Sequence, residues 1–218
     1  MVETNNRIFH FNKHFFMMKE IISIPFFALL FTTFLHAQEP KLKKIFTGKN
    51  LKGWKVLPEQ NSCWTAAKGI LFVKSNADKK GSILWTEKSY EDFVFQTEFL
   101  MGDGTVDSGI FLRSENDQVQ IGISGSLKRD MTGSPYIPSL KYPVEAKGVK
   151  EILKLKDWNT LKIKTLNKTY TVWLNGVEVM TYTSENMIPS GPIGIQLHPG
   201  NEMSISYRKM VLGVLEKQ

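Results

Sequence analysis

Cysteine and histidine are scarce in this chain of 218 residues, and their scarcity excludes several kinds of site. Cys63 is the only cysteine, so no disulfide can form within the chain. Three of the four histidines, His10, His14 and His36, lie in the first 37 residues, and His198 is the only one beyond them. A tetrahedral zinc site of His and Cys side chains is therefore excluded after residue 37. A metal would have to be a hard divalent cation, of the Ca²⁺ or Mg²⁺ type, bound mainly by oxygen atoms.

Motifs for nucleotide binding and for nucleophilic catalysis are missing as well. The sequence has no Gly-x-Gly-x-x-Gly, no phosphate-loop lysine and no Gly-x-Ser-x-Gly. The formal net charge is +7, but the basic residues are scattered, except for Lys41, Lys43 and Lys44. Nucleic acid is therefore not an expected partner.

The long apolar run of the chain lies near its N-terminus. It covers residues 21–35 and ends in Leu35-His36-Ala37, which is typical of a cleavable export signal. The run is shorter than the roughly 20 residues that span a bilayer, so a permanent membrane span is the weaker interpretation. We predict that residues 1–37 are a signal peptide, with a true start that could also be Met17 or Met18, and that the protein is periplasmic or secreted.

The remainder, residues 38–218, is predicted to form one all-β domain. The clearest strand covers residues 93–99, where Phe93, Phe95 and Phe99 alternate with polar Gln96 and Glu98. Similar alternation is present at 108–113, 119–123, 193–198 and 203–208. No apolar period of 3.6 residues persists long enough to predict a substantial helix.

Two connections stand out between these strands. Residues 170–174 and 177–179 flank Asn175-Gly176, which predicts a hairpin with a two-residue type I′ turn. Between about residues 125 and 156 the alternation fades into a loop far longer than the usual 4 to 6 residues. Loops of this length are usually functional or disordered.

The polar positions of the predicted strands suggest a ligand. They would line one sheet face if their strands are neighbours, and they are Gln96, Glu98, Arg113, Gln118, Gln120, Gln196 and His198. Amides, a carboxylate, an Arg and a His suit a polyhydroxylated ligand such as an oligosaccharide or glycoside. The simpler interpretation is that these residues form the solvated side of a sandwich.

A series of motifs in a fixed order extends over nearly all of this region. They are Ile45-Phe46-Thr47-Gly48-Lys49-Asn50-Leu51-Lys52-Gly53-Trp54, Tyr90-Glu91-Asp92-Phe93 with Glu98-Phe99, Asp107-Ser108-Gly109-Ile110 with Arg113, Asp157-Trp158-Asn159, Asn175-Gly176, and Gly194-Ile195-Gln196-Leu197-His198. Together they resemble the 3-keto-disaccharide hydrolase family. The resemblance implies a concanavalin A-like jelly roll, a sandwich of two antiparallel sheets.

The sequence departs from the family pattern at two places. It has Asp107-Ser108-Gly109 where many members carry Asn-Ser-Gly, and Gln118-Val119-Gln120 followed by Ile123 where many carry Glu-x-Gln and then an Asp. Lys128, Arg129 and Asp130 follow nearby on the long loop, so the missing acid could have moved there.

The resemblance implies an enzyme that acts on sugars oxidised at C3. A ketone at C3 acidifies the C2 proton, so a base can remove it, the C1 substituent can leave, and water can add to the unsaturated product. This chemistry needs a base with a pKa near the working pH, a cationic group at the enolate oxygen and an acid for the leaving group.

We assign these roles as a hypothesis, with His198 or Glu98 as the base, Arg113 at the enolate and Asp130 as the acid. A structural role is the alternative for each: His198 could cap the turn at Pro199-Gly200, Arg113 could pair with Glu98, and Asp130 could cap its loop. The residues predicted to bind substrate are Gln96, Gln118, Gln120, Lys128, Arg129, Tyr136 and Gln196.

Other residues leave alternatives open. Trp54, Trp64 and Trp158 could stack on a sugar, although large aromatics in a sandwich are more often core residues. Asp103 and Asp107 could bind a hard cation or stabilise the turn around Gly102. The main rival to an enzyme is a non-catalytic glycan-binding jelly roll, and a third interpretation is a structural exported domain without a small ligand.

Overall fold

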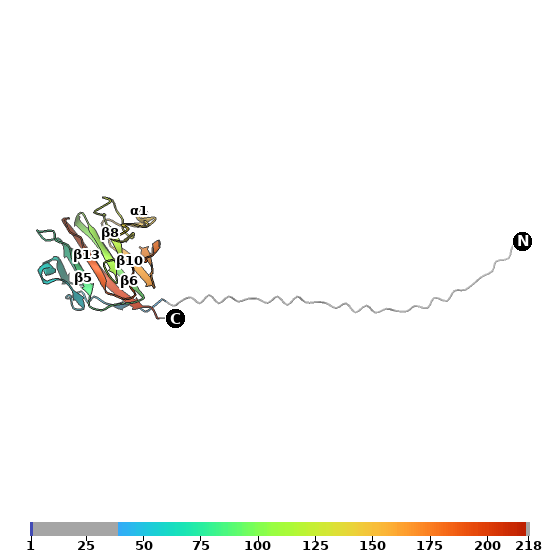
Figure 1. Ribbon diagram of the computed structural model, residues 1–218, viewed down its shortest axis with the longest axis horizontal. Helices are drawn as coiled ribbons and strands as arrows, with labels where there is room; N and C mark the ends of the chain where they lie inside the picture. The colour runs from blue at the N-terminus through green and yellow to red at the C-terminus, as the bar shows by residue number, and fades with distance from the viewer. Residues whose placement is uncertain (2–38, 217–218) are drawn as a thin grey trace. The chain divides into compact units, whose positions relative to one another are not determined.

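The computed structural model describes Met1 and residues 39–216 (Figure 1). The predicted leader, its cleavage point and the alternative starts lie outside the described residues. Among the residues that are described, no helix is long and apolar enough to cross a membrane.

Within residues 39–216, two antiparallel sheets pack into a sandwich (Figure 1). The larger sheet contains β1 (Lys43–Lys44), β3 (Trp64–Ala67), β4 (Ile70–Lys74), β6 (Phe93–Gly104), β10 (Asn159–Leu166), β11 (Thr169–Leu174), β12 (Val177–Thr183) and β14 (Met203–Val214). Its order is β12-β11-β10-β6-β14-β4-β3, with β1 paired to β14.

The smaller sheet contains β2 (Trp54–Lys55), β5 (Ser82–Thr86), β7 (Asp107–Leu112), β8 (Gln118–Gly122), β9 (Pro135–Tyr136) and β13 (Ile193–Leu197). Its order is β2-β5-β13-β7-β8-β9. The described helical segments are short, namely the 3₁₀ helix η1 (Pro58–Cys63) and α1 (Val149–Ile152). The predicted all-β jelly roll of two antiparallel sheets is confirmed.

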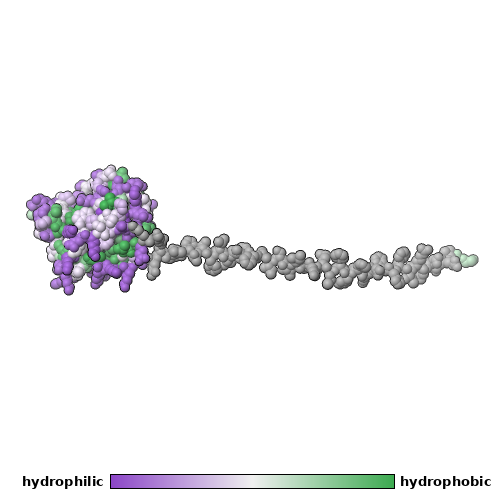
Figure 2. Space-filling view, turned by 60° about the horizontal axis from the view of Figure 1, so that its bottom comes forward, coloured by the Kyte–Doolittle hydropathy of each residue, from purple (hydrophilic) through white to green (hydrophobic). Residues whose placement is uncertain are grey.

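The core lies between the sheets and follows the alternation of the sequence. Phe93, Phe95 and Phe99 of β6 are fully buried, and Ile110 and Leu112 of β7 face them from the smaller sheet. Each such side chain contributes about 1.5 to 3 kcal/mol when it leaves water. On the face seen in Figure 2, hydrophilic residues dominate and hydrophobic ones form separate patches.

Two of the three tryptophans considered above belong to this core. Trp54 and Trp64 are buried, and the indole of Trp64 donates a hydrogen bond to Oγ of Ser82 at 2.9 Å. Trp158 is half-buried, and the guanidinium of Arg208 lies 3.9 Å from the centre of its ring.

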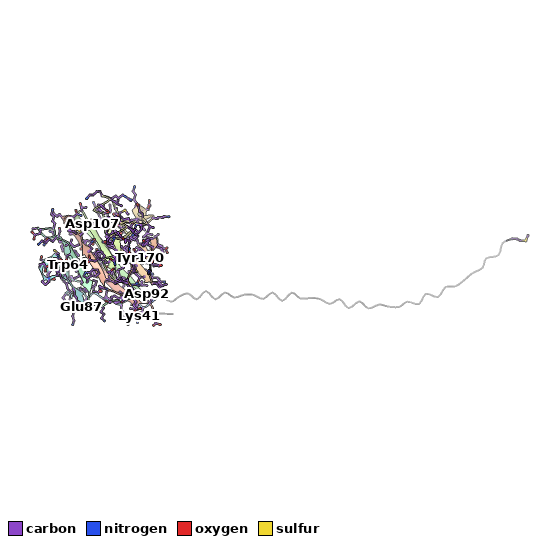
Figure 3. All side chains as sticks on the ribbon, viewed as in Figure 1. Lys41, Trp64, Glu87, Asp92, Asp107 and Tyr170 are labelled. Carbon is purple, nitrogen blue, oxygen red and sulfur yellow. The ribbon has the colours of Figure 1, made fainter. Side chains whose placement is uncertain are left out.

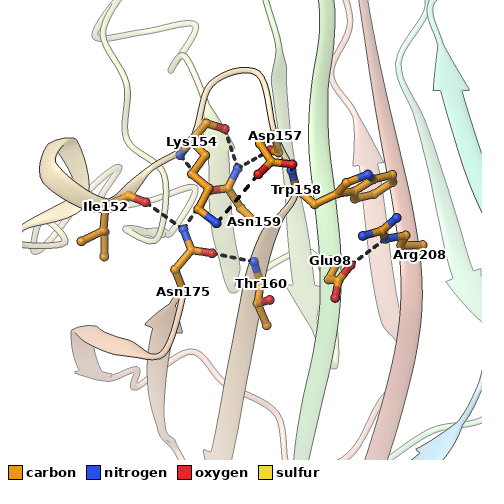
Figure 4. A network of polar contacts seen from close by, with 9 residues as sticks. All are labelled: Glu98, Ile152, Lys154, Asp157, Trp158, Asn159, Thr160, Asn175 and Arg208. Carbon is orange, nitrogen blue, oxygen red and sulfur yellow. Dashed lines mark hydrogen bonds and ion pairs between the residues drawn. The ribbon is translucent and has the colours of Figure 1, made fainter.

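The predicted hairpin is confirmed. Asn175 and Gly176 have φ angles of 51° and 86°, as a type I′ turn requires, and Leu174 pairs with Val177. The Asn175 side chain donates to the Ile152 carbonyl and to Oδ1 of Asn159, at 2.8 and 2.9 Å (Figure 4). The Asn175-Gly176 motif therefore has a structural role, because the Asn175 side chain joins the hairpin turn to the start of β10.

The long segment after residue 125 is mostly irregular, as expected, and it follows the free edge of β8. Gln120 donates a backbone hydrogen bond to the Ser134 carbonyl, and Met131 donates one to the Gly122 carbonyl. β9 then pairs with β8 through Gln118 and Tyr136. The loop thus extends the smaller sheet and forms a wall beside its outer face.

Candidate functional site

The outer face of the smaller sheet carries a row of amide side chains. In the strand register, Gln196 of β13 lies opposite Gly109 of β7, which lies opposite Gln120 of β8. In the next row on that face, Phe111 lies opposite Gln118. Because residues paired across strands point to the same side, these side chains share one face, and their neighbours along each strand point into the core.

A cavity of about 740 Å³ opens over these amides. It is lined by Asp107, Phe111, Glu115, Gln118, Gln120, Ser124, Gly125, Ser126, Lys128, Tyr136, Pro138, Tyr142, Gln196, His198, Pro199, Gly200 and Asn201. The volume lies in the range of about 300 to 1,000 Å³ that is usual for small-molecule sites. The sheet therefore forms the floor of a ligand-sized site, and the long loop forms one wall.

Asp107 and His198 meet at one end of this cavity. Leu197 of β13 pairs with Ser108 of β7 in an antiparallel register. The next residue along β13, His198, therefore lies beside the residue before Ser108, Asp107. Oδ2 of Asp107 lies 3.6 Å from Nδ1 of His198, and the backbone of Gly125 covers the pair.

The environment of Asp107 is unusual for a carboxylate. Its side chain is only 3% exposed, Oδ1 accepts a hydrogen bond from Gln120 at 2.8 Å, and Oδ2 has no hydrogen bond of normal geometry. Burial raises the pKa of Asp107, and Gln120, the His198 ring and the Gly125 backbone lower it by less. A buried carboxyl with a raised pKa, in a cavity and beside a histidine, is a common feature of acid–base sites.

The His198 ring is 38% exposed and is held from one side. Its Nδ1 lies 2.8 Å from the Pro199 carbonyl oxygen, which can only accept, so Nδ1 carries the proton in that hydrogen bond. In the neutral ring Nε2 is then the basic nitrogen. The backbone and the neighbouring carboxylate thus select one tautomer.

The amides of the floor are fixed by hydrogen bonds to each other and to Asp107. Gln118 donates from Nε2 to Oε1 of Gln196 at 2.7 Å, and its side chain passes over Gly109. A Cβ at Gly109 would lie 2.0 Å from Nε2 of Gln118, so the glycine leaves room for the crossing amide. The amides of the floor are therefore hydrogen-bonded to one another and to Asp107 without a ligand.

The loop contributes Lys128 and two tyrosines. The rings of Tyr136 and Tyr142 contact edge to face, with centroids 5.2 Å apart. Burial raises the pKa of Tyr142 to about 12, and a hydrogen bond with Ser124 only partly offsets this. Tyr142 consequently keeps its proton at neutral pH and can donate a hydrogen bond into the cavity.

Six of the predicted site residues line this cavity, and their roles stay predictions. They are His198, Gln118, Gln120, Lys128, Tyr136 and Gln196. The other five, Gln96, Glu98, Arg113, Arg129 and Asp130, do not line this cavity.

Gln96 and Glu98 belong to β6 of the larger sheet. Glu98 accepts a hydrogen bond from Arg208 at 2.6 Å (Figure 4) and another from Lys209 at 2.7 Å. Burial tends to raise the pKa of Glu98, but these two cations outweigh it and the pKa is lowered. Glu98 is thus held ionised by surface ion pairs away from the cavity, and the alternative considered for Arg113, a pair with Glu98, is not formed.

Arg113 follows the opposite end of β7 from Asp107, six residues and therefore about 20 Å away along the strand. Its side chain is buried and donates to the carbonyl oxygens of Asn167 and Ile188 and to Asp92. Figure 3 shows Asp107 and Asp92 toward opposite ends of the sandwich. The expectation that Arg113 and His198 converge is therefore wrong.

Arg129 and Asp130 line a separate cavity of about 580 Å³ between the loop and the α1 region. Asp130 accepts a hydrogen bond from the backbone N–H of Thr132 at 2.8 Å, which is the loop-capping role given above as its alternative. Arg129 pairs with Glu145 on the surface. Neither residue lines the cavity at His198.

Several residues of the site escaped the sequence reasoning as ligand or acid–base candidates. Asp107 was considered only for a cation or a turn, and Tyr142, Phe111 and Glu115 were not considered. Asp107 begins β7, which pairs with β13, and His198 directly follows β13, but this pairing of distant segments is not visible in the alternation of the sequence. Within residues 39–216, no group of three or more His, Cys, Asp or Glu side chains could hold a metal ion.

The fold and the cavity define a jelly-roll protein with a polar, ligand-sized site on one sheet. The model of the 3-keto-alpha-glucoside-1,2-lyase-like domain matches residues 41–212, and the chain belongs to this family, as its motifs indicated. A search of curated proteins finds no match.

Solved structures share the fold at low sequence identity. A candidate glycosyl hydrolase from Parabacteroides distasonis is 21% identical, with a TM-score of 0.61 over 80% of this chain and 100% of that chain. The carbohydrate recognition domain of Emp47p is 16% identical, with a TM-score of 0.50 over 80% and 97%. A Bacillus subtilis protein with a galectin-like fold is 10% identical, with a TM-score of 0.51 over 83% and 99%. Family and fold together support a carbohydrate-active jelly roll, either glycosyl hydrolase-like or carbohydrate-binding.

Proposed function

We propose that this chain is an exported enzyme that cleaves 3-keto-glycosides by elimination and hydration. One observation carries the proposal. A buried carboxyl, Asp107, lies beside His198 in a cavity whose floor is made of fixed amides. Family membership supports the same chemistry.

The reaction has two stages. In the first, a base removes the C2 proton of the 3-keto sugar, the electron pair forms the C1–C2 double bond, and the C1–O bond to the leaving group breaks as the leaving oxygen takes up a proton. In the second, water adds across this double bond, so that hydroxide bonds to C1 and a proton returns to C2. The products are a free 3-keto sugar and an alcohol, and one water is consumed.

His198 is the proposed base. Nδ1 is engaged with the Pro199 carbonyl, so Nε2 is free to accept the C2 proton. Asp107, 3.6 Å from Nδ1, stabilises the imidazolium that forms and keeps the ring in place. Histidine is the side chain that serves most often as a general acid or base.

Lys128 and Tyr142 are the proposed donors to the enolate oxygen at C3. Both line the cavity on the loop side, facing the sheet that holds His198. A cation and a neutral hydroxyl donor both stabilise negative charge that develops on an oxygen. The raised pKa of Tyr142 keeps the hydroxyl in its donating form.

The experiment is turnover of a 3-keto-glucoside by the wild type and by His198→Ala and Asp107→Asn. We expect each substitution to lower kcat by about 100-fold or more, the usual contribution of a general acid or base. Glu98→Gln on the other sheet is the matched control and should retain full activity. Parallel assays with EDTA and with added Ca²⁺ or Mg²⁺ test whether a hard cation takes part.

A glycan-binding protein without catalysis is the second candidate function. The hydrogen-bonded floor of Gln118, Gln120 and Gln196 favours it, because fixed amides can bind sugar hydroxyls without any reaction. If the wild type binds glycosides but converts no 3-keto-glucoside, this second function replaces the first.

A further inference from the structure

A second cavity adjoins the first on the same face of the smaller sheet, and the proposed reaction does not use it. Its volume is about 510 Å³, and it is lined by Lys55, Val56, Leu57, Gln60, Gly81, Ser82, Ile83, Trp85, Phe111, Glu115, Gln196, Leu197 and Pro199. Phe111, Glu115, Gln196 and Pro199 line both cavities. The two cavities are therefore parts of one groove across the sheet.

The floor of the second cavity is an aromatic shelf, in which the half-buried Trp85 ring is the exposed part and Phe111, only 5% exposed, supports it. Their rings are stacked, with centroids 5.6 Å apart and planes inclined by 28°. Gly194 lies between them in the strand register, opposite Trp85 on one side and Phe111 on the other. A Cβ at Gly194 would lie 2.6 Å from the Trp85 ring, so the glycine lets the indole lie across the sheet.

The rim of the shelf is polar and electrically balanced. Gln60 and Gln196 supply amides, while Lys55 and Glu115 supply one positive and one negative charge. A flat apolar floor within a polar rim suits a neutral pyranose ring, whose C–H face packs on aromatic rings while its hydroxyls reach the rim.

We propose that the Trp85–Phe111 shelf binds the leaving sugar of a 3-keto-disaccharide, and that the oxidised sugar lies beside Asp107 and His198. The inference rests on the proposed function. Asp107 and Phe111 are four residues apart on β7, or about 13 Å, which is more than one pyranose ring covers. The bond to be cleaved then lies between the cavities, where Glu115 is the titratable side chain that lines both.

The test compares two substrates that differ only in the leaving group, a 3-keto-disaccharide with a glucosyl leaving group and methyl 3-keto-glucoside. Trp85→Ala should raise KM for the disaccharide by about tenfold, which is the loss expected for one aromatic stack, and should leave KM for the methyl glycoside unchanged. Trp173→Ala is the matched control, because Trp173 is half-buried on the larger sheet beneath Lys162. An equal change for both substrates, or none for the disaccharide, would overturn the proposal.

A binding experiment separates this inference from the proposed function. If the wild type converts neither substrate, the enzyme proposal fails, and the shelf is then tested with the unoxidised disaccharide by calorimetry. Trp85→Ala should raise the dissociation constant by about tenfold, and Trp85→Phe, which keeps a flat ring, should restore most of the affinity. An unchanged dissociation constant in a Trp85→Ala protein with a native circular dichroism spectrum would rule the shelf out.

Discussion

Arg113 donates a hydrogen bond from Nη2 to Oδ1 of Asp92 at 2.8 Å, at the end of β7 that is remote from His198. Two carbonyl oxygens, of Asn167 and Ile188, accept from Nη1, and the residue is only 2% exposed. The Asp92 carboxylate also accepts from the backbone N–H of Asn167 at 2.7 Å. This arginine therefore ties the end of β7 to the β10–β11 turn and to the segment before β13.

Arg113→Met should destabilise the protein without changing its chemistry. Removing one partner of a buried ion pair costs about 3 to 5 kcal/mol, and the lower end applies because the Asp92 side chain is 16% exposed. Urea unfolding measures the loss. Arg208→Met, which breaks a half-exposed pair with Glu98, should cost about 1 kcal/mol or less. A stable Arg113→Met protein without activity would instead support a catalytic role for Arg113.

Asp107→Asn should remove activity and yet make the protein no less stable at pH 7. Burial raises the folded pKa of Asp107 above its unfolded value, so the folded state binds the proton more tightly. The free energy of unfolding therefore falls as the pH rises from the pKa of Asp107 in the unfolded state to its higher pKa in the folded state. Above the folded-state pKa, this loss of stability stays constant. Asparagine avoids the loss and can still accept the hydrogen bond from Gln120.

The measurement for Asp107 is urea unfolding of the wild type and Asp107→Asn between pH 3 and pH 7. The stability of the variant relative to the wild type should increase as the pH rises. A difference that stays constant over this range would mean that the Asp107 carboxyl has an ordinary pKa. A loss of kcat without a loss of stability is the pattern expected of a functional group that is costly to bury.

Much of the fold could be predicted from the sequence because its signals are local. Alternation at Phe93, Phe95 and Phe99 defines a core face directly, and Asn175-Gly176 defines a turn through its positive φ angles. Both depend on residues within one strand or one hairpin. The order of strands in the two sheets depends on contacts between distant segments, and alternation alone does not contain it.

That missing information explains the errors in the site. Glu98 and His198 both point outward, but from different sheets, and strand alternation marks both in the same way. Arg113 follows β7, a strand that does contribute to the site, but at the end remote from the site. The position of the site along β7 depends on where β13 ends. The amides of Gln118 and Gln120 were found because their neighbours Val119 and Ile121 mark the inner face of the same strand.

Gly109→Ala should weaken ligand binding more than it weakens the fold. The new Cβ would lie 2.0 Å from Nε2 of Gln118, and its three nearest atoms all belong to that side chain, so the amide must move. Moving it breaks the hydrogen bond to Gln196 in the middle of the groove. A loss of about 1 kcal/mol, or roughly fivefold in the dissociation constant of a disaccharide, is expected.

Calorimetric titration of the disaccharide, with urea unfolding alongside, checks the Gly109 prediction. Gly200→Ala is a suitable comparison, since Gly200 lines the cavity and a Cβ there meets nothing within 4 Å, although its φ of 90° adds backbone strain. Unchanged affinity in Gly109→Ala would show that the position of the Gln118 amide does not matter for binding.

Tyr142→Phe should lower activity without altering the alkaline side of the pH profile. Burial raises the pKa of Tyr142 to about 12, so the hydroxyl is protonated throughout the range of an ordinary assay. The substitution removes a donor to the enolate oxygen, for which we expect a loss of kcat of about 100-fold. Phenolate absorbance provides an independent check, because the wild type minus Tyr142→Phe difference should show no ionisation near the ordinary tyrosine pKa of about 10. A phenolate that forms near pH 10 in this difference, or an alkaline limb that moves in Tyr142→Phe, would show that Tyr142 ionises during turnover and acts as an acid or base.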